Sequence, residues 1–148
     1  MITYTIDPIH SAADFKVRHL MVTNVRGEFS GVSGSLAFDP ENPANSKVEA
    51  KIPTATIQTR DPQRDAHLKS ADFFDVQQFP TVSFISTRVK RTGDGELALT
   101  GDLTIHGVTR EVVFKVEGPT PPAKDPCGNT RIGLSAVTKI NRKDFDLI

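Results

Sequence analysis

The segment Thr59–Pro80, TRDPQRDAHLKSADFFDVQQFP, interrupts a chain that otherwise alternates apolar and polar residues with a period of two. A helix-start signal lies near its beginning, because Asp61 can accept hydrogen bonds from free backbone amides and Pro62 fits the first helical position. We predict a short helix from about Pro62 to Lys69. Such a helix would lie across the mouth of a sheet formed by the alternating segments.

The two sides of this segment differ in chemistry. Helical spacing places three basic or titratable residues on one side: Arg60, Arg64 and His67. It places three apolar residues on another side: Leu68, Ala71 and Phe74. Beyond the helix, Pro80 imposes an extended conformation on Phe79 before the next strand. One side of the segment is therefore basic and the other apolar.

Alternation before and after the segment predicts about seven strands. From Ala13 to Met21 the odd-numbered residues are the apolar ones, and His19 lies among them. The parity of the apolar positions shifts near Gly31 and again near Pro53, which predicts a bulge or sharp bend at the first place and a bulged strand at the second. We predict an all-β fold, an antiparallel barrel, because closure of a sheet removes its exposed edges. A sandwich with the same number of strands is the alternative.

Two glycine-containing stretches predict hairpin turns. The first, Thr92–Gly95, joins the run after Pro80 to the run that contains Leu97 and Leu103. The second, His106–Thr109, leads from there into a run with alternating apolar residues up to position 116. These turns predict consecutive antiparallel strands in this part of the chain.

Length and composition limit the function. The chain of 148 residues is expected to form one domain, residues 1–148. Basic and acidic residues number 18 each, which argues against nucleic acid as a partner. The single cysteine, Cys127, excludes an intrachain disulfide and a thiolate zinc site. No apolar run reaches the roughly 18 residues of a membrane span, so we expect no stable membrane insertion. The N-terminus lacks a signal-peptide pattern, so we expect a cytoplasmic protein, or a periplasmic one if the native N-terminus has been removed.

A series of short motifs resembles the YceI-like family of small lipid-binding proteins over essentially the whole chain. The motifs are Ile6–Ser11 (IDPIHS), Phe15–Leu20 (FKVRHL), Gly27–Phe29 (GEF), Arg64–Leu68 (RDAHL), Asp72–Asp75 (DFFD), Phe79–Phe84 (FPTVSF), Gly101–Thr109 (GDLTIHGVT) and Asn141–Phe145 (NRKDF). The resemblance implies an extended, lipocalin-like antiparallel barrel of eight strands, with a helix near its mouth and a long apolar pocket. It also implies that the ligand is an amphiphile such as a polyisoprenoid, an isoprenoid quinone or a fatty amide.

Two features depart from the family pattern. That pattern continues beyond the Asn141–Phe145 motif for about one more hairpin, whereas this sequence ends at Ile148. We therefore expect the barrel either to lack its C-terminal hairpin or to close differently, and edges exposed in this way would favour a homodimer. Asp146 stands where the family has glycine, so the geometry of the turn there is open.

The apolar residues of the strands and of the helical segment are candidates for the wall of a lipid pocket. Core packing explains each one taken alone, whereas the set in a barrel favours a pocket, in which each buried methylene contributes about 0.8 kcal/mol. The candidates are Phe15, Val17, His19, Phe29, Leu36, Phe38, Ile57, Leu68, Phe73, Phe74, Phe79, Phe84, Leu103, Ile105 and Phe114. Candidates for contact with a polar head group are Arg60, Arg64 and His67. The alternatives are that Arg64 and Asp65 pair with neighbouring loops and that the basic side of the helix is only solvated.

Other uses of the polar residues are weaker hypotheses. His19, predicted to point into the barrel, either holds a structural hydrogen bond or contacts a ligand oxygen. A hydrolase or other enzyme would need His10 with Ser11, or His67 with Asp65, at the barrel mouth, but the sequence contains no G-x-S-x-G nucleophile elbow. The four histidines lack metal-ligand spacing, so no metal site is predicted. A stress-related interaction protein with a filled barrel would show the same alternation.

From these observations we predict a non-enzymatic protein that binds, stores or transports a long amphiphilic lipid inside the barrel. The lipid, a polyisoprenoid or similar molecule, is the expected ligand and partner, and no other cofactor is expected. We predict no catalytic residues.

Overall fold

One strongly curled antiparallel sheet forms most of the protein. The computed structural model describes residues 1–19 and 23–147, without the side chains of residues 18, 19, 23 and 24. Seven strands form a sheet in the order β1-β4-β5-β6-β7-β8-β11, while β2 pairs with β3 and β9 with β10 in two separate hairpins. In the described part of the chain, the strands are β1 Ile2–Thr5, β2 Ala13–His19, β3 Thr23–Phe29, β4 Ser33–Phe38, β5 Lys47–Pro53, β6 Thr81–Gly93, β7 Glu96–Ile105, β8 Val108–Glu117, β9 Ala123–Lys124, β10 Thr130–Arg131 and β11 Ser135–Val137.

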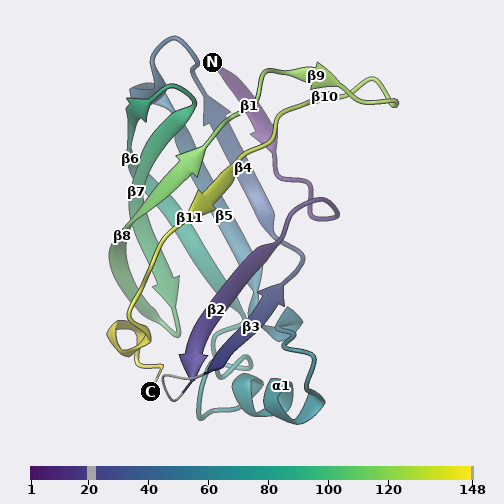
Figure 1. Ribbon diagram of the computed structural model, residues 1–148, viewed down its shortest axis with the longest axis vertical. Helices are drawn as coiled ribbons and strands as arrows, with labels where there is room; N and C mark the ends of the chain where they lie inside the picture. Colours follow the sequence, from purple (N-terminus) through teal and green to yellow (C-terminus); the bar gives the residue numbers. More distant parts are fainter. Residues whose placement is uncertain (20–22, 148) are drawn as a thin grey trace.

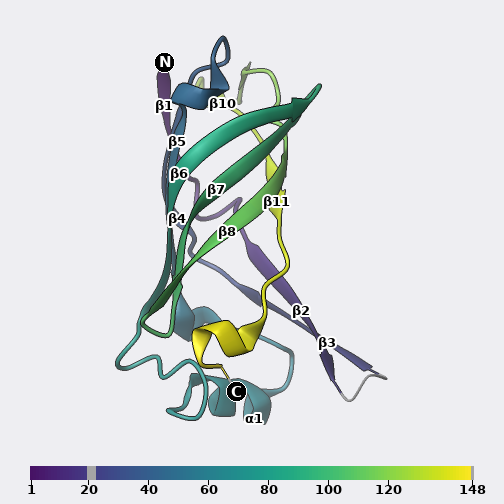
Figure 2. The ribbon, with the colours of Figure 1, turned by 90° about the vertical axis from the view of Figure 1, so that its left-hand side faces the viewer.

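The sheet curls into a half-barrel, as Figures 1 and 2 show. Its two end strands are β1 and β11. Figure 2 also shows the β2–β3 hairpin extending away from the sheet. A bridge between Glu28 and Gln58 joins β3 to the segment that follows β5. The prediction of a barrel-type fold is thus confirmed, and the alternative of a two-layer sandwich is wrong because one sheet curls on itself.

The three longest strands form consecutive hairpins, as predicted. β6 and β7 are joined by a turn in which Gly95 has φ 68°, and β7 and β8 by a turn in which His106 has φ 56° and Gly107 has φ 73°. Two successive positive φ angles define a type I′ turn, whose twist matches that of the flanking strands. This turn therefore fixes the β7–β8 register, in which Ile105 lies opposite Val108.

The shifts in apolar parity have two different causes. Near Gly31, with φ 71°, the chain makes the predicted sharp bend between β3 and β4. Near Pro53 the predicted bulged strand is wrong, because β5 ends there and the 3-10 helix η2, Thr54–Thr56, follows. The bulges lie instead in β6, where the register with β7 shifts between Ser86 and Arg88 and again near the hairpin turn.

Helix α1 spans Pro62–Lys69, as predicted. Its N-cap residue Asp61 accepts hydrogen bonds from the backbone N–H groups of Gln63 at 3.1 Å and Arg64 at 3.2 Å. The helix ends before Ala71 and Phe74, so the prediction that these residues extend its apolar face is wrong. They lie on turns after the helix, in a segment held by backbone bonds such as Phe74 N–H to Leu68 C=O at 3.0 Å.

The core lies on the concave side of the sheet. Residues directly opposite each other on neighbouring antiparallel strands point to the same side, so Phe84 on β6, Leu103 on β7 and Arg110 on β8 share the concave face. The C-terminal 3-10 helix η3, Arg142–Phe145, contributes Phe145, which is 1% exposed. Figure 1 shows α1 and η3 at the same end of the half-barrel. The core residues are Val82, Phe84, Val89, Leu97, Leu99, Leu103, Ile105, Val116, Phe145 and Leu147.

Candidate functional site

The concave face is the candidate site, and most of the predicted pocket residues lie on it or beside it. Strand alternation turns Leu97, Leu99, Leu103 and Ile105 of β7 inward, and all four are buried. Six of the predicted residues are buried: Phe29, Leu36, Ile57, Phe84, Leu103 and Ile105. Eight are half-buried: Phe15, Val17, Phe38, Leu68, Phe73, Phe74, Phe79 and Phe114. The side chain of His19 lies outside the described residues.

Among the described residues, contacts between phenylalanine rings form two groups instead of one continuous wall. On the sheet, the rings of Phe84 and Phe114 meet edge to face with centroids 5.2 Å apart. Beside α1, Phe29 contacts Phe15 at 5.6 Å and Phe74 at 5.7 Å. The second group joins the β2–β3 hairpin to the segment after α1. Aromatic pairs of this kind prefer edge-to-face or tilted geometry, which both groups show.

Glycines permit close packing at two points, one on the concave face and one in the β2–β3 hairpin. A Cβ atom on Gly101 of β7 would lie 2.6 Å from Cζ of Phe84, and a Cβ atom on Gly27 of β3 would lie 2.3 Å from Cζ of Phe15. Larger side chains at these positions would therefore displace the aromatic rings. The two glycines fix where Phe84 and Phe15 lie.

The C-terminal segment fills one end of the concave face, which the sequence analysis missed. The side chain of Asn141 accepts a hydrogen bond from the Lys143 backbone N–H at 3.0 Å and so starts η3, which places Phe145 in the core. Asp146 then adopts φ 57° and ψ 25°. This left-handed conformation explains why glycine suits the position, and aspartate is among the residues that tolerate it. The signal for this turn was the Asn141 cap followed by Asp146.

Arg64 does not lie on an open basic face. Its Nε donates to Oγ1 of Thr59 at 2.8 Å, and its Nη2 donates to the Thr59 carbonyl oxygen at 2.9 Å. Asp65 Oδ1 accepts hydrogen bonds from the same threonine, from N–H at 2.8 Å and from the hydroxyl at 2.6 Å. Thr59 is 5% exposed, so its polar atoms need these partners. Arg64 and Asp65 therefore fix the start of α1.

The other two predicted head-group residues lie apart from this network. Arg60 is exposed and has φ 65°, at the bend that leads into α1. His67 contacts Asp72, with 3.3 Å between Nε2 and Oδ2, and its ring meets Phe73 edge to face at 5.0 Å. No contact among the described residues brings Arg60, Arg64 and His67 together at one point. They remain predicted head-group contacts, of which Arg60 and His67 are exposed.

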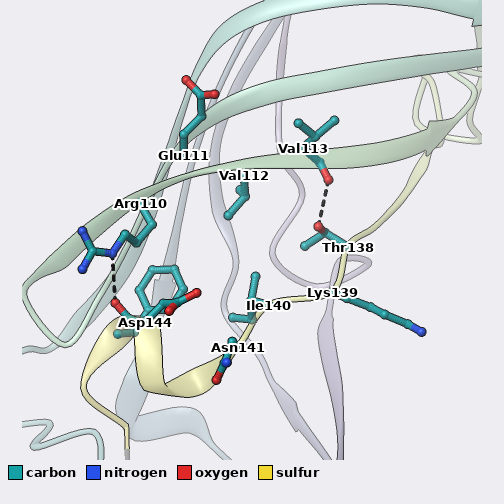
Figure 3. Close-up of a pocket in the computed structure, with 10 residues that line it drawn as sticks. Arg110, Glu111, Val112, Val113, Thr138, Lys139, Ile140, Asn141 and Asp144 are labelled. Carbon is teal, nitrogen blue, oxygen red and sulfur yellow. Dashed lines mark hydrogen bonds between the residues drawn. The ribbon is translucent and has the colours of Figure 1, made fainter.

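Two of the hollows among the described residues lie near the concave face. The larger, about 290 Å³, lies between β8 and residues 138–145, and Figure 3 shows its wall. Its lining includes charged residues such as Glu111 and Lys139. Between two other lining residues, Arg110 Nε donates a hydrogen bond to the Asp144 carbonyl oxygen at 3.1 Å. The smaller hollow, about 70 Å³, is lined mainly by apolar side chains. Of the predicted pocket residues, Phe38 lines the smaller hollow.

An ion-pair network lies close to the smaller hollow. Arg131 contacts Asp7 Oδ2 through Nη1 at 2.7 Å and Asp125 Oδ2 through Nε at 2.5 Å. His10 Nδ1 also lies 2.8 Å from Asp7 Oδ2. Hydrogen bonds from His10, from Arg131 and from the Ile9 N–H hold the pKa of Asp7 well below its usual range. Arg131 and the Asn129 N–H lower the pKa of Asp125 in the same way.

In residues 1–19 and 23–147, no three His, Cys, Asp or Glu side chains gather closely enough to hold a metal ion. Over the same residues, no helix has both the length and the apolar character needed to cross a membrane. Three residues of the enzyme alternative have partners within the structure. His10 contacts Asp7, His67 contacts Asp72, and Asp65 accepts a hydrogen bond from Thr59.

The protein is an all-β protein of the barrel type, in which an antiparallel sheet curls into a half-barrel with an apolar concave face. The model of the YceI-like domain matches residues 4–148, and the chain belongs to the YceI-like family. A UPF0312 protein of Pseudomonas putida is 40% identical to it over 138 residues, which cover 93% of this chain and 71% of that protein. The resemblance to this family is thus confirmed.

Solved structures show the same fold. The crystal structure of the Campylobacter jejuni YceI protein has a TM-score of 0.75 and 34% identity, and the match covers 99% of this chain and 85% of that one. A polyisoprenoid-binding domain from Saccharophagus degradans has a TM-score of 0.60 and 13% identity, covering 98% of this chain and 76% of that domain. The second likeness concerns the fold.

Proposed function

We propose that the protein binds a long amphiphilic lipid, such as a polyisoprenoid, an isoprenoid quinone or a fatty amide, against its concave face, without catalysing a reaction. The observation that carries the proposal is the apolar lining of this face, where partly exposed side chains such as Phe114, Val112 and Phe38 adjoin the buried core. Family membership and the polyisoprenoid-binding domain of the same fold support it.

Hydrocarbon burial supplies the affinity in this proposal. Each methylene or similar group removed from water contributes about 0.8 kcal/mol, so a chain with several isoprene units gains many kcal/mol before ordering costs. The polar head group then orients the lipid and contributes less. Arg60 and His67 are exposed and available for that contact, whereas Arg64 is held by Thr59. Storage or transport of the lipid is the proposed use of this binding.

Mass spectrometry of an organic extract of the purified protein is the first test. We expect a lipid in near-stoichiometric amount, and the same lipid should bind again after delipidation. An extract without lipid, together with delipidated protein that binds neither geranylgeraniol nor a long-chain fatty amide, would overturn the proposal.

Two neighbouring residues of β8 provide a matched pair of variants. Phe114 faces the concave side opposite Leu99, whereas Val113 is 52% exposed on the outer side. Removing the partly exposed Phe114 ring should cost about 1 to 2 kcal/mol of lipid affinity, which is about 5- to 30-fold in Kd. Phe114→Ala should therefore weaken binding by this factor, and Val113→Ala should leave it within twofold of the wild type. Equal effects of the two substitutions would place the lipid elsewhere.

A further inference from the structure

The two ends of the curled sheet meet through side chains at a seam, which we define as the contact between residues 2–7 and residues 120–132. Residues 2–5 are β1, at one end of the sheet, and residues 120–132 connect β8 to β11, at the other end. Figure 1 shows this connection passing near the N-terminus, at the end of the molecule away from α1. A barrel closed by backbone hydrogen bonds has no seam of this kind, because those hydrogen bonds would have to break before the barrel could open.

The inner part of the seam is the smaller hollow. Ile2 and Tyr4 of β1 and Phe38 of β4 line it from one side, and Pro122 and Ile132 line it from the other. Ile2 lies opposite Phe38, and Tyr4 opposite Leu36, so these residues share one face of the sheet. Phe38 also packs against the hydrophobic core. The hollow therefore borders the concave face and has the apolar chemistry that a hydrocarbon chain requires.

The outer part of the seam is the ion-pair network. Arg131 directly precedes Ile132, and it reaches across to Asp7, just beyond β1. Each carboxylate is fixed by its own loop: Asp7 accepts from the Ile9 N–H at 3.0 Å, and Asp125 accepts from the Cys127 N–H at 2.9 Å. Among the ion pairs of the described residues, the contact between Arg131 and Asp7 is the one that joins the two sides of the seam.

We propose that the seam is the portal through which the hydrocarbon chain of the amphiphile reaches the concave face, and that Arg131 is the latch that limits how fast the portal opens. This proposal rests on the proposed lipid binding. The side chain of Arg131 is 46% exposed and that of Asp7 is 28% exposed, so water and salt screen their attraction. A weak contact of this kind opens often, which suits a portal better than a permanent closure.

The latch acts on rates more than on affinity, because neither Arg131 nor Asp7 is among the residues that line the apolar hollow. Exposed ion pairs contribute little free energy, and breaking one should speed opening by about 1.5- to 5-fold. Uptake and release should then accelerate together. The equilibrium Kd, which is the ratio of the two rate constants, should stay nearly constant.

The test is stopped-flow fluorescence with the dansyl amide of geranylgeranylamine as the probe. Arg131→Gln should raise the uptake and release rate constants of the full chain by about 1.5- to 5-fold, with Kd within twofold of the wild type. Asp7→Asn should do the same from the other side of the seam, and the double variant should be no faster than Arg131→Gln alone. Sodium chloride at 500 mM should accelerate the wild type but not Arg131→Gln.

Lys124→Gln serves as the control, because Lys124 is an exposed residue of β9 in the same hairpin as Arg131 and forms no ion pair among those described. Its rates should equal those of the wild type. Wild-type rates in both Arg131→Gln and Asp7→Asn would overturn the latch while leaving lipid binding intact, as would a rise in Kd without faster uptake. A wild-type protein that does not bind the probe, in line with a lipid-free extract, would overturn the lipid-binding proposal and the portal with it.

Discussion

Replacement of Phe145 by alanine should show how far the C-terminal segment holds the fold together. Phe145 is 1% exposed and belongs to the core cluster with residues of β6, β7 and β8. Truncating a fully buried phenylalanine costs about 3 to 5 kcal/mol, which combines the lost transfer free energy and the cavity that remains. Natural domains are stable by only about 5 to 15 kcal/mol, so Phe145→Ala should remove a large share of the free energy of unfolding.

Urea unfolding followed by circular dichroism measures this loss. With an m-value of about 2 kcal/mol/M, the midpoint should fall by about 1.5 to 2.5 M. Lys143→Ala is the matched control, because Lys143 is exposed in the same 3-10 helix and should shift the free energy of unfolding by less than about 0.5 kcal/mol. A loss below 1 kcal/mol for Phe145→Ala, or one equal to that of the control, would refute the conclusion that this side chain fills the end of the concave face.

Three further substitutions test other parts of the structure. Asp65→Ala should lower the free energy of unfolding by about 2 kcal/mol in urea titrations, because it leaves the buried N–H and hydroxyl of Thr59 without an acceptor, and an unchanged midpoint would contradict that role. Gly107→Ala should lower the melting temperature, since φ is 73° there and a Cβ atom would lie 2.6 Å from Cε1 of Phe79; a melting curve like that of the wild type would argue against both constraints. Folding lowers the pKa of Asp7 below its ordinary value of 3.8. The ionised Asp7 carboxylate therefore stabilises the fold above about pH 4, and this stabilisation is lost as the pH falls further. The difference in free energy of unfolding between wild type and Asp7→Asn should narrow below about pH 4 in acid titrations.

The elements that the sequence predicted well are those whose signals are local. Asp61 followed by Pro62 predicts the first turn of α1 because capping depends on the adjacent backbone alone. His106 followed by Gly107 likewise predicts a tight turn, since both residues tolerate positive φ. Alternation correctly assigned the buried side of β7. These signals do not require knowledge of distant parts of the chain.

The parts that the sequence did not predict depend on contacts between distant or irregular segments. Helical spacing placed Arg64 on a basic face, but it could not show that the guanidinium folds back to Thr59 before the helix. A parity shift at Pro53 looks the same whether a strand bulges or ends. Phe145 lies in a 3-10 turn that has no periodic pattern, so hydrophobic periodicity did not predict its burial in the core.

The position of the seam along the chain has a consequence for folding. The hairpins of β6, β7 and β8 pair neighbouring stretches and can form early, whereas Asp7 and Arg131 lie 124 residues apart. Bringing the ends of so long a loop together costs about 4 kcal/mol of chain entropy, more than an exposed ion pair contributes. The nascent chain should therefore join these ends last, after the central meander has shortened the distance between them. Until then, the apolar concave side of the sheet stays exposed to chaperones and neighbouring chains.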